Sequence, residues 1–348
     1  MRLSAWSMVI GFLLAGCCAT PRTSTLKRFE FSEPHMGTLF SITLYAPDET
    51  SAKTGAQAAF QRVTELDRIM TDYNPDSELM RLCRQPAGQA TLVSHDLFDI
   101  LKYSGEVSRQ TGGAFDVTVG PYVAAWRAAR KSKVLPSAQE IAAMRESVGY
   151  QKLRLDTRHQ TVTLLAPNMR LDLGGIGKGY AADRALAALR QHGIRRALVA
   201  ASGDIALGDP PPGKVGWKVG VAVMDGAPDE VTRTVLLHNA GISTSGDSEQ
   251  NIEINGVRYS HIVDPATGLG LTNRIQVTII GPNATVTDGL DTPLGIMGVE
   301  RVLALVDSRP ELAAIITTRD DRGIHVFPSR RFKDIPTAKG PVGMTNVQ

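Results

Sequence analysis

The chain has 348 residues, of which 43% are hydrophobic and 21% are charged, so it is long enough to bury a large core. A formal net charge of +3 and an aromatic content of 5% argue against a nucleic-acid-binding protein, which would need a basic surface or a stacking platform. Three cysteines are too few for a disulfide framework and lack metal-site spacing.

The first 16 residues read as an export signal that is not part of the fold. Arg2 supplies a positive charge, Met8 to Leu14 form a short apolar run, and small residues then precede Cys17. The run is too short to cross a bilayer as a stable helix. The pattern is typical of a bacterial lipoprotein, so we expect Cys17 to become the lipidated N-terminus. An ordinary signal peptide cut near Ala19 is the alternative.

The domain boundaries follow from composition. Residues 17–28 are predicted to be a polar, lipidated tether, residues 29–335 the folded domain, and residues 336–348 a disordered tail. A lipidated chain of this kind would be periplasmic and anchored to a membrane. We prefer the inner membrane to the outer one, although Cys18 leaves that choice open.

The first half of the domain mixes strands and helices. In chain order the expected elements are a strand ending at Tyr45 after a His-Met-Gly turn, helices over Ala56–Met70 and Asp96–Gln110 (the second with Ser94 as N-cap), a glycine turn and β-branched run at Gly112–Pro121, and a short helix after Ser137. Tyr73 is left on a loop after the first of these helices.

The stretch Leu171–Arg184 is the most distinctive in the chain. It is predicted to start as a strand, pass through four closely spaced glycines, and continue as a helix over Tyr180–His192. A helix N-terminus after such a loop suits a phosphate, and Lys178 would add a positive charge. The loop matches neither a Walker loop nor a full dinucleotide-binding fingerprint, so a plain strand-to-helix turn is the alternative.

The second half of the domain is richer in strands. The expected strands are Arg195–Ala201, Trp217–Met224, Thr232–Leu237, Ile275–Ile280, Ala313–Thr317 and Gly323–Phe327. Between them we expect a turn at Ser202–Gly208, a turn or ligand cradle at Gly241–Asp247, and a hairpin at Ile252–Tyr259 with Asn255-Gly256 as its turn. Two helices are expected, one from near Thr285 through Met297 and one at Val299–Val306. Pro293 either kinks the first of these helices or marks its first turn. Without regular βαβ alternation, the pattern favours an α+β fold in one large domain of two packed halves.

Asp288, Asp291 and Thr292 share one helix face because they are three and four residues apart. Oxygen ligands of this kind suit Mg²⁺, which takes its remaining ligands from water and substrate phosphates. The alternative is that they merely decorate the start of a helix, where acidic residues are favoured. His261 could act as an acid or base, or could be a hydrogen-bonded structural residue. No Gly-x-Ser-x-Gly elbow is present, and Cys83 has no nearby His.

Eight short motifs, spread in order over roughly residues 31–327, together resemble the FAD:protein FMN transferase family, the ApbE-like flavin transferases. They are His35–Thr38, Thr71–Tyr73, Gly113–Asp116, Leu171–Tyr180, Ser202–Asp204, Thr244–Asp247, Ser260–Pro265 and Asp288–Thr292. The resemblance implies a T-fold-like α+β architecture that binds FAD at a Mg²⁺ site. It implies transfer of FMN to a Thr or Ser hydroxyl with release of AMP, and targets that are flavoprotein subunits of membrane redox complexes.

The resemblance also assigns site residues. It places FAD contacts at Met36, Tyr73, Ala114, Phe115, Asp116, Gly174, Lys178, Tyr180 and Ile262, and Mg²⁺ ligands at the Gly177 carbonyl, Asp288, Asp291 and Thr292. His261 or Asp288 could accept the proton of the attacking hydroxyl, and we favour His261. Two rival functions are a Mg²⁺-dependent FAD pyrophosphatase and a non-catalytic periplasmic FAD-binding lipoprotein.

Overall fold

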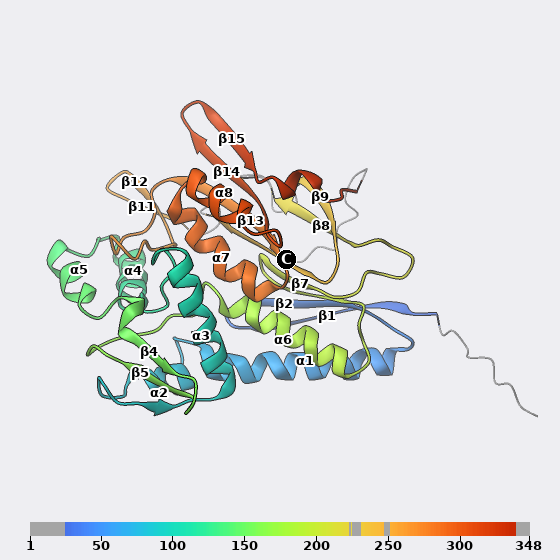
Figure 1. Cartoon of the computed structure of the whole chain (residues 1–348), viewed down its shortest axis with the longest axis horizontal. Coiled ribbons are helices and arrows are strands. Elements are labelled where there is room, and N and C mark those ends of the chain that lie inside the picture. The colour runs from blue at the N-terminus through green and yellow to red at the C-terminus, as the bar shows by residue number, and fades with distance from the viewer. Residues whose placement is uncertain (1–24, 223, 225–230, 247–250, 339–348) are drawn as a thin grey trace, which may run out of the picture.

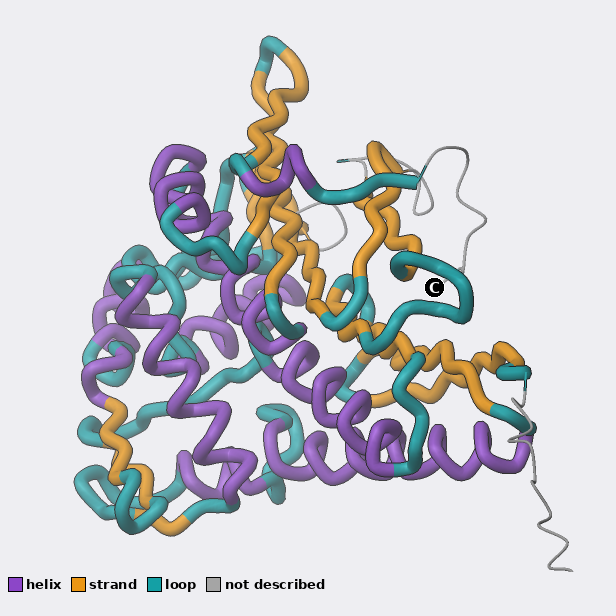
Figure 2. The backbone as a smooth tube through the Cα atoms, turned by 45° about the vertical axis from the view of Figure 1, so that its right-hand side comes forward, coloured by secondary structure: helices purple, strands orange, loops and turns teal. Residues whose placement is uncertain are grey.

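An eight-stranded sheet lies at the centre of the fold (Figures 1 and 2). A computed structural model describes residues 25–222, 224, 231–246 and 251–338 of the chain. In order across the sheet, the strands are β1 (Lys27–His35), β2 (Thr38–Ala46), β6 (Ala197–Ala201), β7 (Asp204–Leu207), β10 (Ala240–Gly246), β13 (Arg274–Gly281), β14 (Ala313–Asp320) and β15 (Gly323–Pro328). Neighbouring strands are antiparallel, which confirms the predicted α+β class.

Three helices pack on one face of this sheet and enclose the main core: α1 (Glu49–Met70), α6 (Gly177–Gln191) and α7 (Ala284–Met297). Figure 1 shows α1 and α6 running side by side below β1 and β2. Apolar residues at helical spacing in α1, such as Val63 and Leu66, are fully buried. The helix starts earlier than predicted because Asp48 acts as its N-cap, accepting a 2.8 Å hydrogen bond from the Ser51 N–H.

The other face of the sheet is covered by β8 (Trp217–Ala222), β9 (Val231–Leu237) and the 3-10 helix η2 (Arg331–Asp334). The chain then continues beyond the predicted domain end at 335. The Pro336 carbonyl accepts from the Leu236 N–H at 2.8 Å, and Thr337 bridges Val235. Residues 336–338 therefore lie against β9, where backbone pairing extends the β8–β9 pair. Residues 339–348 lie outside the described part.

The remaining elements pack around the helices and at one end of the sheet. They are α2 (Glu78–Cys83), β3 (Thr91–Leu92), α3 (His95–Gln110), α4 (Gly120–Ser132), α5 (Ala138–Arg145), the 3-10 helix η1 (Tyr150–Lys152), β4 (Leu153–Asp156), β5 (Thr161–Leu164), β11 (Asn251–Ile254), β12 (Val257–Ser260) and α8 (Val299–Asp307). A small separate core joins α4 to the β11–β12 hairpin through Tyr122, Trp126 and Ile254. Within the described residues, none of the helices combines the length and hydropathy needed to cross a membrane.

Several local predictions are confirmed by the side chains that carry them. Ser94 caps α3 by accepting from the Leu97 N–H, and Ser137 forms a complete capping box with Glu140 at the start of α5. Asn255 and Gly256 both have positive φ, as a two-residue hairpin turn requires. Pro293 lies inside α7 and not in its first turn.

Three other predictions are wrong. Leu171 makes no regular strand, and only an isolated bridge joins the neighbouring Arg170 to Val119. The predicted turn at Ser202–Gly208 contains β7, and the predicted turn or cradle at Gly241–Asp247 is β10, with Asp247 outside the described residues. The small residues of β10 serve packing, since a Cβ at Gly241 would overlap the Asn283 backbone. They let α7 approach the sheet closely.

A further correction concerns the region after the glycine turn at Gly112. The β-branched run there is not a strand, because the Asp116 carboxylate accepts a 2.8 Å hydrogen bond from the Thr118 N–H and closes a turn. The unpredicted helix α4 follows at once, with Pro121 in its first turn.

Candidate functional site

The first turns of α6 and α7 lie against each other, and Gly179 makes this possible. A Cβ atom at Gly179 would lie 2.7 Å from Asp288 Cβ and would overlap the Ala284 carbonyl. The Gly179 N–H instead donates a 2.7 Å hydrogen bond to Asp288 Oδ2. Asp183, also on α6, accepts from the Ala284 and Thr285 N–H groups at 3.0 and 2.8 Å and so caps α7. The α7 carboxylates are thereby held beside the glycine-rich loop.

Three buried carboxylates converge at this place, and we call them the acidic cluster: Asp204 from β7, and Asp288 and Asp291 from α7. One oxygen from each lies within 4.8 Å of the others. Thr292 donates a 3.2 Å hydrogen bond to Asp291 Oδ1, and the Lys178 ammonium pairs with Asp204. Asp288, Asp291 and Thr292 therefore meet as the helical spacing predicts.

Electrostatics in the acidic cluster disfavours three separate negative charges. Burial, together with the Asp204 charge, raises the pKa of Asp288 to about 7. Burial and the charges of Asp204 and Asp288 also raise the pKa of Asp291 well above its usual range. Burial acts against the charge of Lys178, yet Asp204 and then Asp288 keep the Lys178 pKa above its usual value. The cluster thus favours a nearby cation.

The donor set of the acidic cluster fits a hard divalent cation such as Mg²⁺. All its ligand atoms are oxygens, which Mg²⁺ prefers. Asp204 Oδ1 is buried and has no hydrogen-bond partner within the described part of the chain, so an acceptor is left for an ion. Lys178 neutralises only one of the three carboxylates.

Asp204 is the member of the acidic cluster that the sequence prediction did not assign to the site. It belongs to the motif Ser202–Asp204, which was noted only as part of the family pattern. The sequence did contain a sign that Asp204 is functional. It directly precedes the apolar run Ile-Ala-Leu, and an Asp that is buried with such a run is rare unless it is paired. Its partners, however, come from segments distant in the chain.

The glycine loop meets the site at Gly175. A Cβ at Gly175 would lie 3.6 Å from both Thr292 Oγ1 and a ring carbon of Phe115. The predicted metal ligand Gly177 is instead the first residue of α6, where a backbone carbonyl points along the helix toward the residue four positions on. Because a carbonyl oxygen has a second lone pair beside the one that a helical hydrogen bond uses, the role of Gly177 as a metal ligand stays a prediction. Gly174, the predicted flavin contact, is exposed, and its N–H donates to Asp172 Oδ1 at 2.8 Å.

Met36 and Tyr73 come together through Asp67, near the end of α1. The Met36 N–H and the Tyr73 hydroxyl donate to the two Asp67 oxygens, each at 3.3 Å. Met36 has a φ of +50° in the β1–β2 turn, which is uncommon for methionine, and its Cε lies 3.5 Å from where a Gly177 Cβ would be. Tyr73 is 60% exposed and therefore accessible to a ligand. Two predicted flavin contacts thus share Asp67, and one of them, Met36, also reaches the glycine loop.

The Gly113–Asp116 motif packs an aromatic ring against the glycine loop and fixes its own turn by hydrogen bonds. Phe115 is buried against the glycine loop, and Ala114 beside it is half-buried. The Asp116 carboxylate accepts from the Thr118 N–H, the Thr118 hydroxyl and the Tyr150 N–H at 2.8, 2.6 and 2.8 Å. The Asp116 side chain thus shapes the loop through these bonds, and its contact with FAD stays a prediction.

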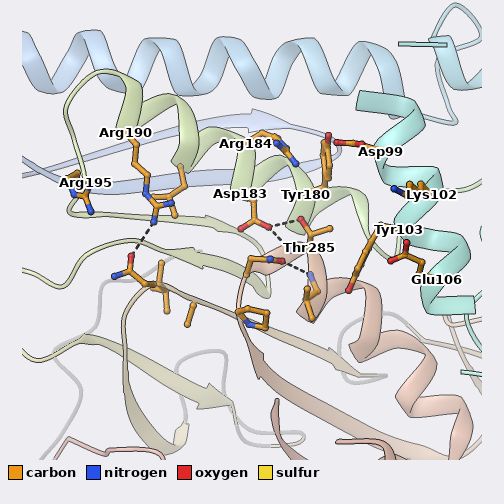
Figure 3. A pocket seen from close by; sticks show the side chains of 17 residues that line it. Asp99, Lys102, Tyr103, Glu106, Tyr180, Asp183, Arg184, Arg190, Arg195 and Thr285 are labelled. Carbon is orange, nitrogen blue, oxygen red and sulfur yellow. Dashed lines mark hydrogen bonds between the residues drawn. The ribbon is translucent and has the colours of Figure 1, made fainter. Parts of the chain in front are cut away.

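Tyr180 faces away from the acidic cluster. Residues two apart on a helix point about 200° apart, and Lys178 points at Asp204. The Tyr180 hydroxyl donates to Asp96 Oδ1 at 3.0 Å, and its ring lines a different cavity, shown in Figure 3. The predicted contact between Tyr180 and FAD stays a prediction, and any such contact would lie away from the acidic cluster.

His261 and Ile262 follow β12. His261 is exposed, and Ile262 is buried with its carbonyl accepting from the Leu271 N–H at 2.9 Å. The adjacent Ser260 hydroxyl accepts from the Ile262 N–H at 3.1 Å, which holds the start of this loop. His261 is thus placed where a group arriving from solvent can reach it.

Known proteins resemble this chain over most of its length. Residues 36–316 match the model of the ApbE family. An FAD:protein FMN transferase from Salmonella typhimurium is 31% identical, with 94% of this chain and 95% of that protein covered. The solved flavin transferase ApbE from Vibrio cholerae superposes with a TM-score of 0.81 at 30% identity, covering 89% of this chain and all of that one. The ApbE protein from Thermotoga maritima gives a TM-score of 0.80 at 27% identity over 90% of this chain.

Proposed function

This chain belongs to the ApbE family, and from that premise we infer that it is an FAD:protein FMN transferase, an enzyme that moves the FMN part of FAD onto a protein. One observation carries this inference. The family match spans residues 36–316, and this range contains every residue of the acidic cluster and of the glycine loop beside it. A cation-binding cluster next to a phosphate-compatible loop is the chemistry that cleavage of a pyrophosphate needs.

We propose that the transfer depends on Mg²⁺ held by Asp288, Asp291 and Thr292. Asp204 supplies a further carboxylate to the same place. When bound, Mg²⁺ would neutralise negative charge on the FAD pyrophosphate. Lys178, held by Asp204, would add a fixed positive charge beside the same phosphates. Met36 and Phe115 flank the loop against which the flavin would lie, and Tyr73 shares Asp67 with Met36.

The proposed reaction is a phosphoryl transfer to a Thr or Ser hydroxyl of the target. The hydroxyl oxygen forms a bond to the FMN phosphorus, and the bond from that phosphorus to the bridging pyrophosphate oxygen breaks. AMP leaves with that oxygen, and the hydroxyl proton passes to a base. We assign this base to His261, because its exposed position suits an acceptor that arrives as part of another protein.

Two alternatives share the site. A Mg²⁺-dependent FAD pyrophosphatase differs only in that water attacks, and a non-catalytic FAD-binding lipoprotein would have no use for the acidic cluster. Incubating the protein with FAD, Mg²⁺ and a candidate flavoprotein subunit of a membrane redox complex separates them. Covalent flavin fluorescence on the subunit after denaturing electrophoresis supports the transferase, free FMN without labelling indicates the hydrolase, and intact FAD indicates the binding protein.

His261→Ala is expected to keep FAD affinity while slowing transfer by about 10²–10⁴-fold, the usual contribution of a general base. FAD affinity is measured by flavin fluorescence quenching, and transfer by labelling of the acceptor. His159→Ala, which removes an exposed histidine paired with Asp156 on β4–β5, is the matched control and should transfer normally. Transfer at the wild-type rate in His261→Ala would remove the assignment.

We also propose that the protein is a periplasmic lipoprotein anchored through Cys17, which lies outside the described residues. The motif around Cys17 supports this, as does the polar stretch between it and β1. Cys17→Ser is expected to abolish incorporation of labelled palmitate and to leave the protein out of the membrane fraction. Unchanged labelling in this variant would mean that a residue other than Cys17 carries the lipid.

A further inference from the structure

A cavity of about 790 Å³ lies beside α6, and Figure 3 shows the side chains that line it. Its walls are α3, α6, the start of α7 and the loop before β10, and we call it the α3–α6 cavity. No residue of the acidic cluster lines it, and of the residues predicted to contact FAD only Tyr180 does. It is therefore separate from the site of flavin transfer.

Arg184 is the most informative residue of the α3–α6 cavity. Its guanidinium carbon lies 4.6 Å from the centre of the Tyr180 ring, and Tyr180 is itself fixed by its hydrogen bond to Asp96. Arg184 Nε is buried and has no hydrogen-bond partner among the residues that the structure describes. A buried guanidinium N–H without an acceptor is costly, so this position favours an incoming anion.

Two more cations line the same cavity. Lys102 extends from α3 on the facing wall, as Figure 3 shows, and Arg190 lies about 1.7 turns beyond Arg184 on α6. Neither forms an ion pair with a carboxylate within the described ranges, and Arg190 donates only to the amide oxygen of Asn239, at 3.2 Å. Three uncommitted cations thus surround one space.

Three acidic residues line the cavity, and one of them, Asp183, is engaged by the start of α7. Asp183 accepts three hydrogen bonds at the start of α7, from the Ala284 and Thr285 N–H groups and the Thr285 hydroxyl. Asp99 lies 3.5 Å from His95 Nε2. Glu106 is the remaining acidic residue of the lining. Arg195 also lines the cavity, but its charge is paired with Asp209, which lies outside the lining. Lys102, Arg184 and Arg190 therefore outnumber Asp99 and Glu106 around the cavity by three to two.

We propose that the α3–α6 cavity binds a small phosphorylated molecule of the nucleoside monophosphate class. Arg184, Lys102 and Arg190 would hold its phosphate, because guanidinium groups and ammonium groups pair with phosphate oxygens. Tyr103, Pro282 and Val286 provide an apolar wall for a planar or apolar body, and the volume is within the range of small-molecule sites. The proposal does not depend on the flavin transfer activity.

AMP is the probe for this site. Binding to the full chain is measured by calorimetry without Mg²⁺ and with saturating FAD, which occupies the flavin site. We expect one AMP site that Arg184→Gln and Lys102→Gln each weaken by about tenfold or more, the loss expected for one charged hydrogen bond. Arg109→Gln, on an exposed position of α3 outside the cavity lining, is the matched control and should bind AMP within about twofold of wild type.

Four outcomes decide the proposal. Competition of inorganic phosphate with AMP supports recognition through the phosphate. Adenosine binding as tightly as AMP, or AMP affinity unchanged in both cavity variants, overturns it, as does absence of AMP binding to the wild type at millimolar concentration. Lys102→Gln changes an exposed side chain and should melt like the wild type, so a folding defect in Arg184→Gln leaves the test intact. FAD affinity should be unchanged in both variants.

Discussion

Asp288→Asn is expected to reduce flavin transfer by about 10²–10³-fold and to remove its Mg²⁺ dependence. Asp288 is buried, lies in the acidic cluster with Asp204 and Asp291, and holds the Gly179 N–H through Oδ2. The asparagine oxygen can still accept that hydrogen bond, so the change removes charge while keeping shape. Asp288→Ala should lose activity as well and should also loosen the contact between α6 and α7.

Thermal stability measured with and without Mg²⁺ tests metal binding separately from transfer activity. A ligand that binds only the folded state raises the melting temperature. Mg²⁺ should stabilise the wild type and should have little effect on Asp288→Asn. Asp156→Asn, an exposed carboxylate on β4, is the control and should respond to Mg²⁺ as the wild type does. An unchanged Mg²⁺ titration of Asp288→Asn would show that Asp288 is not a ligand.

Gly179→Ala is expected to destabilise the folded protein by about 1–3 kcal/mol and to abolish transfer. The added methyl group would overlap the Ala284 carbonyl and lie 2.7 Å from Asp288 Cβ, so α6 and α7 must separate. That movement displaces Asp288 from Asp204 and Lys178. Urea unfolding measures the stability, and acceptor labelling measures the transfer.

Gly105→Ala provides the matched control, because Gly105 is also a helical glycine. A Cβ there would meet only Arg109, a flexible side chain of the same helix, at 3.6 Å. Alanine is favoured over glycine inside a helix, so Gly105→Ala should be more stable by about 0.5–1 kcal/mol. If Gly179→Ala were stabilised to the same extent, the close packing of α6 on α7 would not limit the site.

Much of the local structure was accessible from the sequence because its causes are local. Helical periodicity located α1 and α3, Ser94 marked the cap of α3, Ser137 marked the start of α5, and Asn255-Gly256 marked a hairpin turn. The predictions failed where small residues served tertiary packing. Gly241 suggested a turn, yet it lies in a central strand, since only a residue without a side chain lets Asn283 and the start of α7 come so close.

The sequence alone determined that Asp288, Asp291 and Thr292 share a helix face, because three- and four-residue spacing on a helix leaves no other arrangement. Only the tertiary structure decided that Asp204 joins them, that Lys178 pairs with Asp204, and that Tyr180 faces another cavity. These relations link segments far apart in the chain. They are set by the order of strands in the sheet and by the close approach of α6 to α7 at Gly179, which spacing along the sequence does not encode.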